Sequence, residues 1–266
     1  MYLSEKQIKD YENFGVIIIK DIFKDWVDLL RVGFQKVLDN PSKHGRENVN
    51  DNNGRFFEDY CNWERISEFK DCIYNSSAAK IVAEATSSKS TQIFHEHVFI
   101  KEAGTHKETP WHQDIPYYCV DGDDTGSFWI PLDNVDKENN LQLILGSHKW
   151  PKLVRPTKWS NDQSWYKDDS NFMDLPKIDT FKKDILIPEL NLGDAVLFNF
   201  KIVHGSSGNK TSKSRRAFSM RFIGDDVRYI DRGGPTSPPF DGINLKSGDM
   251  MREDWFPRVF NNWYIL

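Results

Sequence analysis

Apolar side chains in the first part of the chain recur mostly at helical spacing. Ser4 followed three residues later by Gln7 is typical of a helix N-terminus, and the helix should run to about Phe14. Gly15 is expected to end it, because glycine readily adopts the left-handed conformation found after helices. The β-branched run Val16–Ile19 then predicts a short buried strand.

Three further segments complete this first part. Asp25–Leu38 carries apolar residues at helical spacing and is followed by Asn40-Pro41, which ends the predicted helix. Lys43–Gly54 is polar and is predicted to be a loop. Trp63–Ala85 predicts one or two more helices. We therefore expect residues 1–90 to be mostly helical and to support the remainder of the chain.

From Thr91 the pattern changes to short apolar segments separated by Gly, Pro, Asp and Asn. The predicted strands are Gln92–Lys101, Phe128–Leu132, Leu141–Leu145, Asp194–Phe200 and Ala217–Ile223. Helices first and short strands afterwards predict an α+β fold with a mainly β core, either an antiparallel barrel or a sandwich.

The expected organisation is one domain over residues 1–266, with the β core at 91–224 and a Gly- and Pro-rich wrap at 225–266. A polar insertion at 155–184 interrupts the core and contains Trp159, Trp165, Tyr166 and Phe172. A loop this long inside a domain is usually a lid, a binding loop or disordered.

Composition narrows the function classes. The formal net charge of -5 and the absence of a basic stripe argue against nucleic acid as a partner. No apolar run is long enough to cross a membrane, and the three cysteines have no CxxC spacing. We therefore expect a soluble cytoplasmic protein in a reducing compartment, monomeric or homodimeric, that acts on a small molecule.

The strongest chemical signal is Trp111-His112-Gln113-Asp114, together with His204 ninety-two residues after His112. If residues 112 and 114 lie on one extended strand, their side chains point to the same face. A second histidine from a distant strand completes a 2-His-1-carboxylate set, which binds non-haem Fe(II) and leaves positions open for reactants. A lone His-x-Asp also occurs by chance in many chains, so its surroundings matter.

Those surroundings resemble the phytanoyl-CoA dioxygenase family of Fe(II)/2-oxoglutarate oxygenases. Thr109–Asp114 (TPWHQD) looks like the iron motif of that family, and Glu138–Lys149 resembles its segment that ends in Pro-Gly-Ser-His. Gly193–Phe198, followed by His204-Gly205-Ser206 and Arg215-Arg216-Ala217, resembles its distal-histidine and arginine segment. The resemblance spans roughly residues 92–223.

The resemblance implies a double-stranded β-helix (jelly-roll) core that binds Fe(II) through His112, Asp114 and His204 and uses 2-oxoglutarate and O2. It also implies that Arg215 binds the distal carboxylate of 2-oxoglutarate, with Arg221 on the same strand face as the fallback. A guanidinium pairs bidentately with a carboxylate, which suits this role.

Three more residues match positions at which the family contacts the cosubstrate. These are Ser206, Trp129 and Lys101, although barrel core and a strand-edge charge explain Trp129 and Lys101 equally well. The aromatic residues Phe56, Phe57, Tyr60 and Trp63 could line a pocket or cage a cationic head group, or simply pack helices onto the barrel.

The sequence departs from the family pattern at Asn140, where Gly is usual, and at Leu145, where Pro is usual. Both positions fall in a turn segment away from the ligands. Relatives that halogenate lack the carboxylate ligand, so the presence of Asp114 implies hydroxylation of an unactivated C–H bond, with release of succinate and CO2. Since no clustered basic mouth for a CoA ester is evident, we expect a small polar or zwitterionic substrate.

Two alternatives remain open. His95-x-His97 followed by Glu102, with His204, resembles a cupin metal motif, although the expected glycine before the first histidine is missing. On that hypothesis those four residues bind the metal, and His112 and Asp114 have no role. The second alternative is a catalytically silent jelly-roll binding protein, which a failure to bind Fe(II) would favour.

Overall fold

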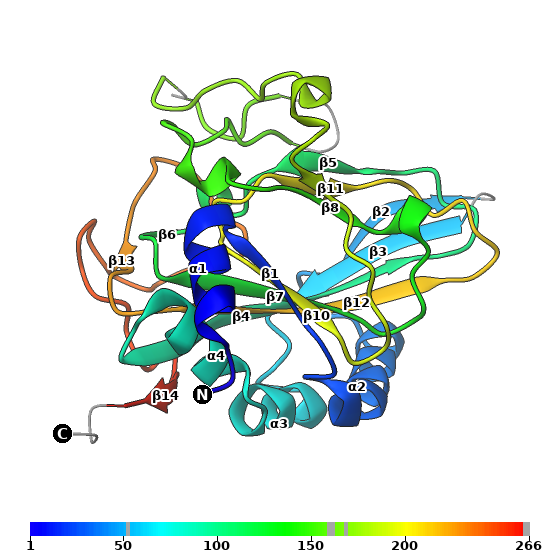
Figure 1. Ribbon diagram of the computed structural model, residues 1–266, viewed down its shortest axis with the longest axis horizontal. Helices are drawn as coiled ribbons and strands as arrows, with labels where there is room; N and C mark the ends of the chain where they lie inside the picture. The colour runs from blue at the N-terminus through cyan, green and yellow to red at the C-terminus, as the bar shows by residue number, and fades with distance from the viewer. Residues whose placement is uncertain (52–53, 159–162, 168–169, 263–266) are drawn as a thin grey trace.

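The computed structural model describes residues 1–51, 54–158, 163–167 and 170–262. Two antiparallel sheets face each other, and helices cover the outer side of the larger one (Figure 1). Trp159, named above in the insertion, lies outside the described residues. Within the described part of the chain, no helix is long and apolar enough to cross a membrane.

The larger sheet has the strand order β1-β10-β7-β12-β4-β3-β2, and β14 pairs with β4 beside this path. Its strands are β1 (Val16–Ile19), β10 (Ala195–Phe198), β7 (Thr125–Pro131), β12 (Arg215–Ile223), β4 (Ser90–Lys101), β3 (Gly54–Tyr60), β2 (Arg46–Asp51) and β14 (Arg258–Asn261).

The smaller sheet has the order β5-β11-β8-β9, and a separate pair joins β13 to β6. These strands are β5 (Thr109–His112), β11 (His204–Ser206), β8 (Leu141–Ile144), β9 (Ile185–Leu186), β6 (Val120–Asp121) and β13 (Arg228–Tyr229). The two large layers are the arrangement of a double-stranded β-helix, although the described strands do not close into a continuous hydrogen-bonded barrel.

Alternation along β4 and β12 assigns their two faces. Val98, Ile100, Phe218 and Met220 belong to the hydrophobic core between the larger sheet and the helices. The residues between them point to the space between the sheets, because successive strand side chains alternate. A β-bulge shifts the register after Arg221, because Arg221 pairs with His95 and Phe222 pairs with Ile93. The extra residue lies on β4, so the side-chain alternation of β4 changes phase there.

Four α-helices are α1 (Glu5–Phe14), α2 (Val27–Asp39), α3 (Ser67–Asn75) and α4 (Ala78–Thr86), and the last three lie below the larger sheet in Figure 1. The helix start predicted at Ser4 is confirmed, with a capping box formed by Ser4 and Gln7. Gly15 ends α1 with φ 70°, as predicted. Short 3-10 turns occur at residues 24–26, 115–117, 137–139, 147–149 and 178–181.

One expectation about the first part of the chain is wrong. The predicted loop at Lys43–Gly54 contains β2, which forms a hairpin with β3 and extends the larger sheet. Residues 1–90 contain the four α-helices together with β1, β2 and β3. The sequence of β2 shows no apolar alternation, so periodicity gave no signal for this edge strand.

Residues of the 155–184 insertion lie over the outer face of the smaller sheet (Figure 1). Met173, Ile178 and Phe181 pack there around buried Ile144, Val154 and Val203. Trp165 instead lines the pocket, and the buried Tyr166 hydroxyl donates to the backbone oxygen of Pro116 (2.8 Å). The insertion therefore contributes both to the core and to the pocket rim.

Candidate active site

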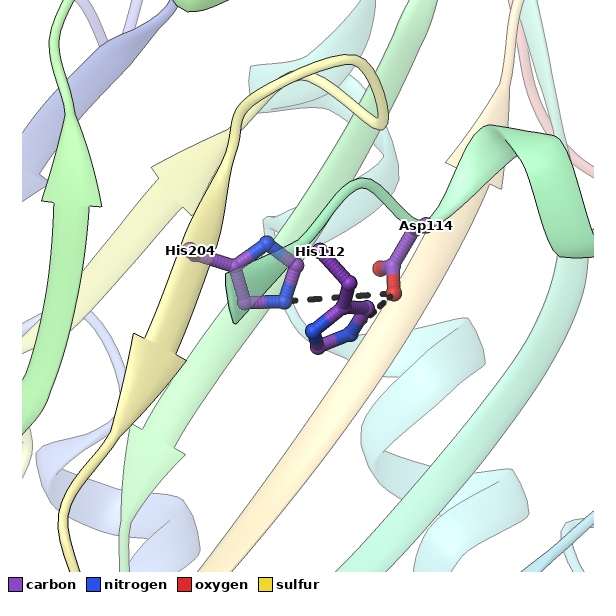
Figure 2. Close-up of side chains that lie close together, drawn as sticks. All are labelled: His112, Asp114 and His204. Carbon is purple, nitrogen blue, oxygen red and sulfur yellow. Dashed lines mark ion pairs between the residues drawn. The ribbon is translucent and has the colours of Figure 1, made fainter. Parts of the chain in front are cut away.

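His112, Asp114 and His204 meet at the edge of the smaller sheet that faces the pocket (Figure 2). His112 ends β5 and His204 begins β11, and the two residues are direct partners in the antiparallel pairing of these strands. All three side chains are buried. The pairing of β5 with β11 thus brings together two motifs that are far apart in the sequence.

The ligand atoms of the three side chains are mutually close. Asp114 Oδ1 lies 3.6 Å from His112 Nε2 and 3.9 Å from His204 Nε2. Each residue offers one ligand atom, and these three atoms lie within 4.8 Å of one another. Among the described residues, no other group of three or more His, Cys, Asp or Glu side chains meets that condition.

Both histidines are held in the tautomer that a metal requires. His112 Nδ1 donates to the backbone oxygen of Pro110 (2.7 Å), and His204 Nδ1 donates to that of Ile202 (3.0 Å). Each ring therefore carries its lone pair on Nε2, the atom that faces Asp114. Burial, followed by the neighbouring His112, lowers the pKa of His204 to about 4, so this ring is neutral at physiological pH.

Asp114 reaches the site by a route that the sequence pattern did not predict. We expected residues 112 and 114 on one strand, but β5 ends at His112 and Asp114 has helical backbone angles (φ -73°, ψ -47°). The turn is fixed because the amides of Asp114 and Ile115 both donate to the backbone oxygen of Phe200. Gln113 also ties this turn to Val154 and Lys201 through its side-chain amide.

Arg221 on β12 is the ionic partner of Asp114. Its Nε lies 3.1 Å from Asp114 Oδ2, the carboxylate oxygen that is not nearest the histidines. Burial opposes ionisation of Asp114, but Arg221 and the two histidines outweigh it and hold the pKa of Asp114 well below its usual range. The carboxylate is therefore charged and oriented, with Oδ1 left on the histidine side.

Arg215 lies in the same pocket with an unusual lack of partners. Its guanidinium is buried, Nη1 donates to the backbone oxygen of Asn139 (2.6 Å), and Nε has no hydrogen-bond partner. No carboxylate of the described residues lies within ion-pair distance of it, and burial lowers its pKa to about 10. A buried cation without an anion is costly unless an anionic ligand completes the site.

The other predicted cosubstrate residues surround Arg215. Ser206 and Trp129 line the pocket, and Arg215 lies 5.8 Å from the centre of the Trp129 ring. Lys101 is fully buried and donates to Ser206 Oγ (3.1 Å) and to the backbone oxygen of Ser207 (2.9 Å). Since the pocket surface does not include Lys101, this residue contacts the site through Ser206.

Sequence reasoning did not identify two charged residues of the pocket wall, Glu58 and Arg46. Glu58 is buried on β3, with His97 Nε2 at 3.3 Å and Arg46 Nη1 at 3.8 Å. Burial opposes its ionisation, but His97 and Arg46 outweigh burial and lower the pKa of Glu58. Tyr60 lies beside these residues, whereas the other members of its predicted aromatic cluster pack into the core or, for Phe56, against Lys101.

The cupin-type arrangement does not form. His95 and His97 line the pocket, but Glu102 lies beyond the end of β4, where its amide donates to the backbone oxygen of Arg55. Within the part of the chain that the structure describes, the potential metal group is instead His112, Asp114 and His204. Two imidazoles and one oriented carboxylate fit the donor preferences of non-haem Fe(II).

Comparisons with known proteins agree with this geometry. The family model for phytanoyl-CoA dioxygenase (PhyH) matches residues 11–217. The chain is 23% identical over 252 residues to the peroxisomal phytanoyl-CoA dioxygenase of Rattus norvegicus, covering 87% of this chain and 72% of that protein. It is 28% identical over 131 residues to a probable phytanoyl-CoA dioxygenase of Caenorhabditis elegans, covering 48% of this chain and 40% of that one.

Solved structures show the same fold at low sequence identity. The α-ketoglutarate-dependent carbocyclase SnoK from nogalamycin biosynthesis superposes with a TM-score of 0.73 at 18% identity, covering 97% of this chain and 96% of that one. EctD from S. alaskensis, with 2-oxoglutarate and 5-hydroxyectoine, superposes with a TM-score of 0.68 at 18% identity, covering 90% and 82% of the two chains.

Proposed function

Because the chain belongs to the phytanoyl-CoA dioxygenase (PhyH) family, we propose that this Fe(II)/2-oxoglutarate-dependent oxygenase hydroxylates an unactivated C–H bond of a small polar or zwitterionic metabolite. The observation that carries the proposal is the convergence of His112, Asp114 and His204 beside a buried arginine that has no anionic partner among the described residues. The family supplies the cofactor set of Fe(II), 2-oxoglutarate and O2.

In this proposal the metal ligands are His112 Nε2, His204 Nε2 and Asp114 Oδ1. The backbone carbonyls of Pro110 and Ile202 hold the two imidazoles in the ligating tautomer. Arg221 holds the other oxygen of Asp114, so that the carboxylate presents one oxygen to the metal. Such outer contacts commonly set metal affinity, because they fix the orientation and charge of each ligand.

Arg215 binds the distal carboxylate of 2-oxoglutarate, with Ser206 as a second contact and Trp129 as the adjacent wall. Burial supports this assignment, since a guanidinium–carboxylate pair is stronger away from water. Lys101 holds the Ser206 hydroxyl in place through the hydrogen bond that its Nζ donates. The neighbouring Arg216 has no part in this, because it lies on the other face of β12 and pairs with Asp133.

Bound Fe(II) and 2-oxoglutarate supply the oxidising chemistry, in which O2 is consumed, succinate and CO2 are released, and a C–H bond becomes C–OH. The protein excludes water and orients the substrate. The carboxylate of Asp114 keeps the third protein position of the metal occupied, which favours hydroxylation over halogenation.

The pocket wall supports a small polar substrate over a CoA ester. The cations that line the pocket are Arg46, Arg215 and Arg221, and the last two are buried. Only Arg46 is substantially solvent-exposed, with 51% of its side chain accessible. One exposed cation provides little attraction for the several phosphate charges of CoA.

We also infer that residues 1–266 act as one domain, since β14 near the C-terminus pairs with β4 of the core. We propose a monomer or homodimer without nucleic-acid or membrane partners. The three cysteines are free, which supports a reducing compartment, and we propose the cytoplasm.

Succinate formation tests the proposed function. Purified protein with Fe(II), ascorbate, 2-oxoglutarate and O2 is supplied with a panel of small polar and zwitterionic metabolites and, separately, with acyl-CoA esters. We expect succinate release to require Fe(II) and to rise with a small polar compound. Stimulation by acyl-CoA esters alone would contradict the substrate class, and failure to bind Fe(II) would favour a silent binding protein.

A further inference from the structure

His95 and Arg221 stand side by side on the inner wall of the pocket. They are direct partners in the pairing of β4 with β12, and the register shifts immediately after them. Such bulges often re-aim side chains near functional sites. Both residues line the pocket, with His95 1% and Arg221 4% exposed.

Each of these side chains has one buried polar atom without a hydrogen-bond partner. These atoms are Nε2 of His95 and Nη1 of Arg221. Most buried polar groups in folded proteins have a partner, so two neighbouring exceptions in one pocket require an explanation. A ligand that satisfies both atoms at once provides one.

One of the two atoms accepts a hydrogen bond and the other donates one. His95 Nδ1 faces the backbone oxygen of Glu96 at 3.2 Å and donates to it, which leaves Nε2 as an acceptor. Burial, and then the nearby Arg221 charge, lower the pKa of His95 well below its usual value, so the ring stays neutral. Arg221 Nη1 can only donate, because arginine has no acceptor atom.

We propose that His95 and Arg221 form a substrate subsite that binds a hydroxyl group, which donates to His95 Nε2 and accepts from Arg221 Nη1. This inference rests on the proposed oxygenase function and specifies the substrate class as an alcohol or polyol. A carboxylate cannot donate to His95, and an ammonium group cannot accept from Arg221. Each would leave one of the two buried atoms unsatisfied.

The position of the pair suits substrate binding rather than cosubstrate binding. Arg221 already contacts Asp114 through Nε, so a hydroxyl on Nη1 lies next to the metal ligands. Tyr118 packs against His95 with ring centres 5.3 Å apart and forms the neighbouring wall. The 2-oxoglutarate carboxylate is proposed to bind at Arg215, six residues along the same strand, which leaves the subsite free for the substrate.

A matched series of small probes tests the subsite. Cyclopentanol, cyclopentanecarboxylate and cyclopentylammonium share one ring and differ in the polar group. Each is titrated anaerobically into protein loaded with Fe(II) and 2-oxoglutarate, so that Arg215 is occupied and no turnover occurs. Tryptophan fluorescence reports binding, because Trp129 and Trp165 line the pocket.

Three variants isolate the role of His95. His95→Phe keeps an aromatic ring but removes the acceptor, and His95→Leu replaces it if the phenyl ring disturbs folding. His95→Gln keeps an acceptor oxygen on the side chain. His106→Phe is the matched control, because His106 is exposed and does not line the pocket.

We expect cyclopentanol to bind the wild-type protein more tightly than either charged probe. His95→Phe should weaken cyclopentanol binding about 3- to 10-fold, the loss of one neutral hydrogen bond, while His95→Gln and His106→Phe stay within about twofold. The affinity for 2-oxoglutarate should be unchanged in all variants, which separates a substrate subsite from a cosubstrate contact.

The proposal is overturned if cyclopentanol does not bind, if a charged probe binds more tightly, or if His95→Phe and the wild-type protein bind cyclopentanol equally. These failures are distinct from failure of the oxygenase proposal. If the wild-type protein shows the visible Fe(II)–2-oxoglutarate absorption band, the oxygenase proposal stands whatever the probes do. If that band is absent, the oxygenase proposal itself fails.

Discussion

Replacing Arg215 by Met should remove most of the affinity for 2-oxoglutarate without unfolding the protein. Met has a similar length and no charge, so the change deletes the guanidinium and keeps much of the packing. In the structure Arg215 is buried, has no carboxylate partner among the described residues, and has one nitrogen without a partner. Its role therefore concerns a ligand more than the stability of the fold.

The magnitude follows from the burial of the guanidinium. Hydrogen bonds to charged groups contribute about 1.5–3 kcal/mol, and a charge left buried without its partner costs about 3–5 kcal/mol. We therefore expect a loss of about 3–4 kcal/mol in binding, which is on the order of 10²- to 10³-fold in Kd. Because the free protein buries an uncompensated charge, Arg215→Met should leave the free energy of unfolding unchanged or raise it by about 1–2 kcal/mol.

Isothermal titration calorimetry of 2-oxoglutarate into anaerobic Fe(II)-loaded protein measures the effect. Arg216→Met is the matched control, since it deletes the same group from the opposite face of β12, where Arg216 pairs with Asp133. The control should bind 2-oxoglutarate with wild-type affinity. Near-normal affinity in Arg215→Met, or equal losses in both variants, would refute the assignment of Arg215.

Three further predictions concern the neighbouring groups. Lys101→Met should weaken 2-oxoglutarate binding about 3- to 10-fold in calorimetry, because Ser206 loses its hydrogen-bond donor; unchanged affinity would argue for a purely structural lysine. Arg221→Met should lower Fe(II) affinity about 10- to 100-fold in a chelator competition, because Asp114 loses its orienting partner; wild-type affinity would contradict this. The metal-free protein should lose stability in acid. The folded pKa of His204 is about 4 against an ordinary 6.5, so the unfolded state binds more protons between these values. The stabilisation is fully present above pH 6.5 and is lost as the pH falls towards 4. At pH 5 the free energy of unfolding is lower by about 2 kcal/mol. Urea unfolding of His204→Gln should show a smaller loss between pH 8 and pH 5; an identical loss would contradict the assignment.

Capping residues and apolar runs in the sequence predicted those helices and strands that bury one face in the core. Ser4, Gln7 and Gly15 set the ends of α1, and the apolar runs set β4 and β12. The β2–β3 hairpin was missed because β2 is polar and its pairing partner is not encoded in its own side chains. A strand of this kind forms because a neighbouring edge offers backbone hydrogen bonds, which is a tertiary effect.

The predicted iron ligands converge in the structure, but the reason given for one of them is wrong. Asp114 faces the histidines through a turn fixed by Phe200, not through strand alternation. Alternation along β12 predicted that Arg221 shares a face with Arg215, and both residues line the pocket. Nothing in the sequence indicated that Arg221 would pair with Asp114, because that contact depends on how the two sheets are stacked.

The visible absorption band of the Fe(II)–2-oxoglutarate chelate reports directly whether His112, Asp114 and His204 bind the metal. Anaerobic protein receives Fe(II), ascorbate and 2-oxoglutarate, and the wild type is compared with His112→Ala, Asp114→Ala and His95→Ala. We expect a band that is lost in the first two variants and kept in His95→Ala. A band that depends on His95 and is indifferent to Asp114 would contradict this expectation, and so would the absence of a band in the wild-type protein.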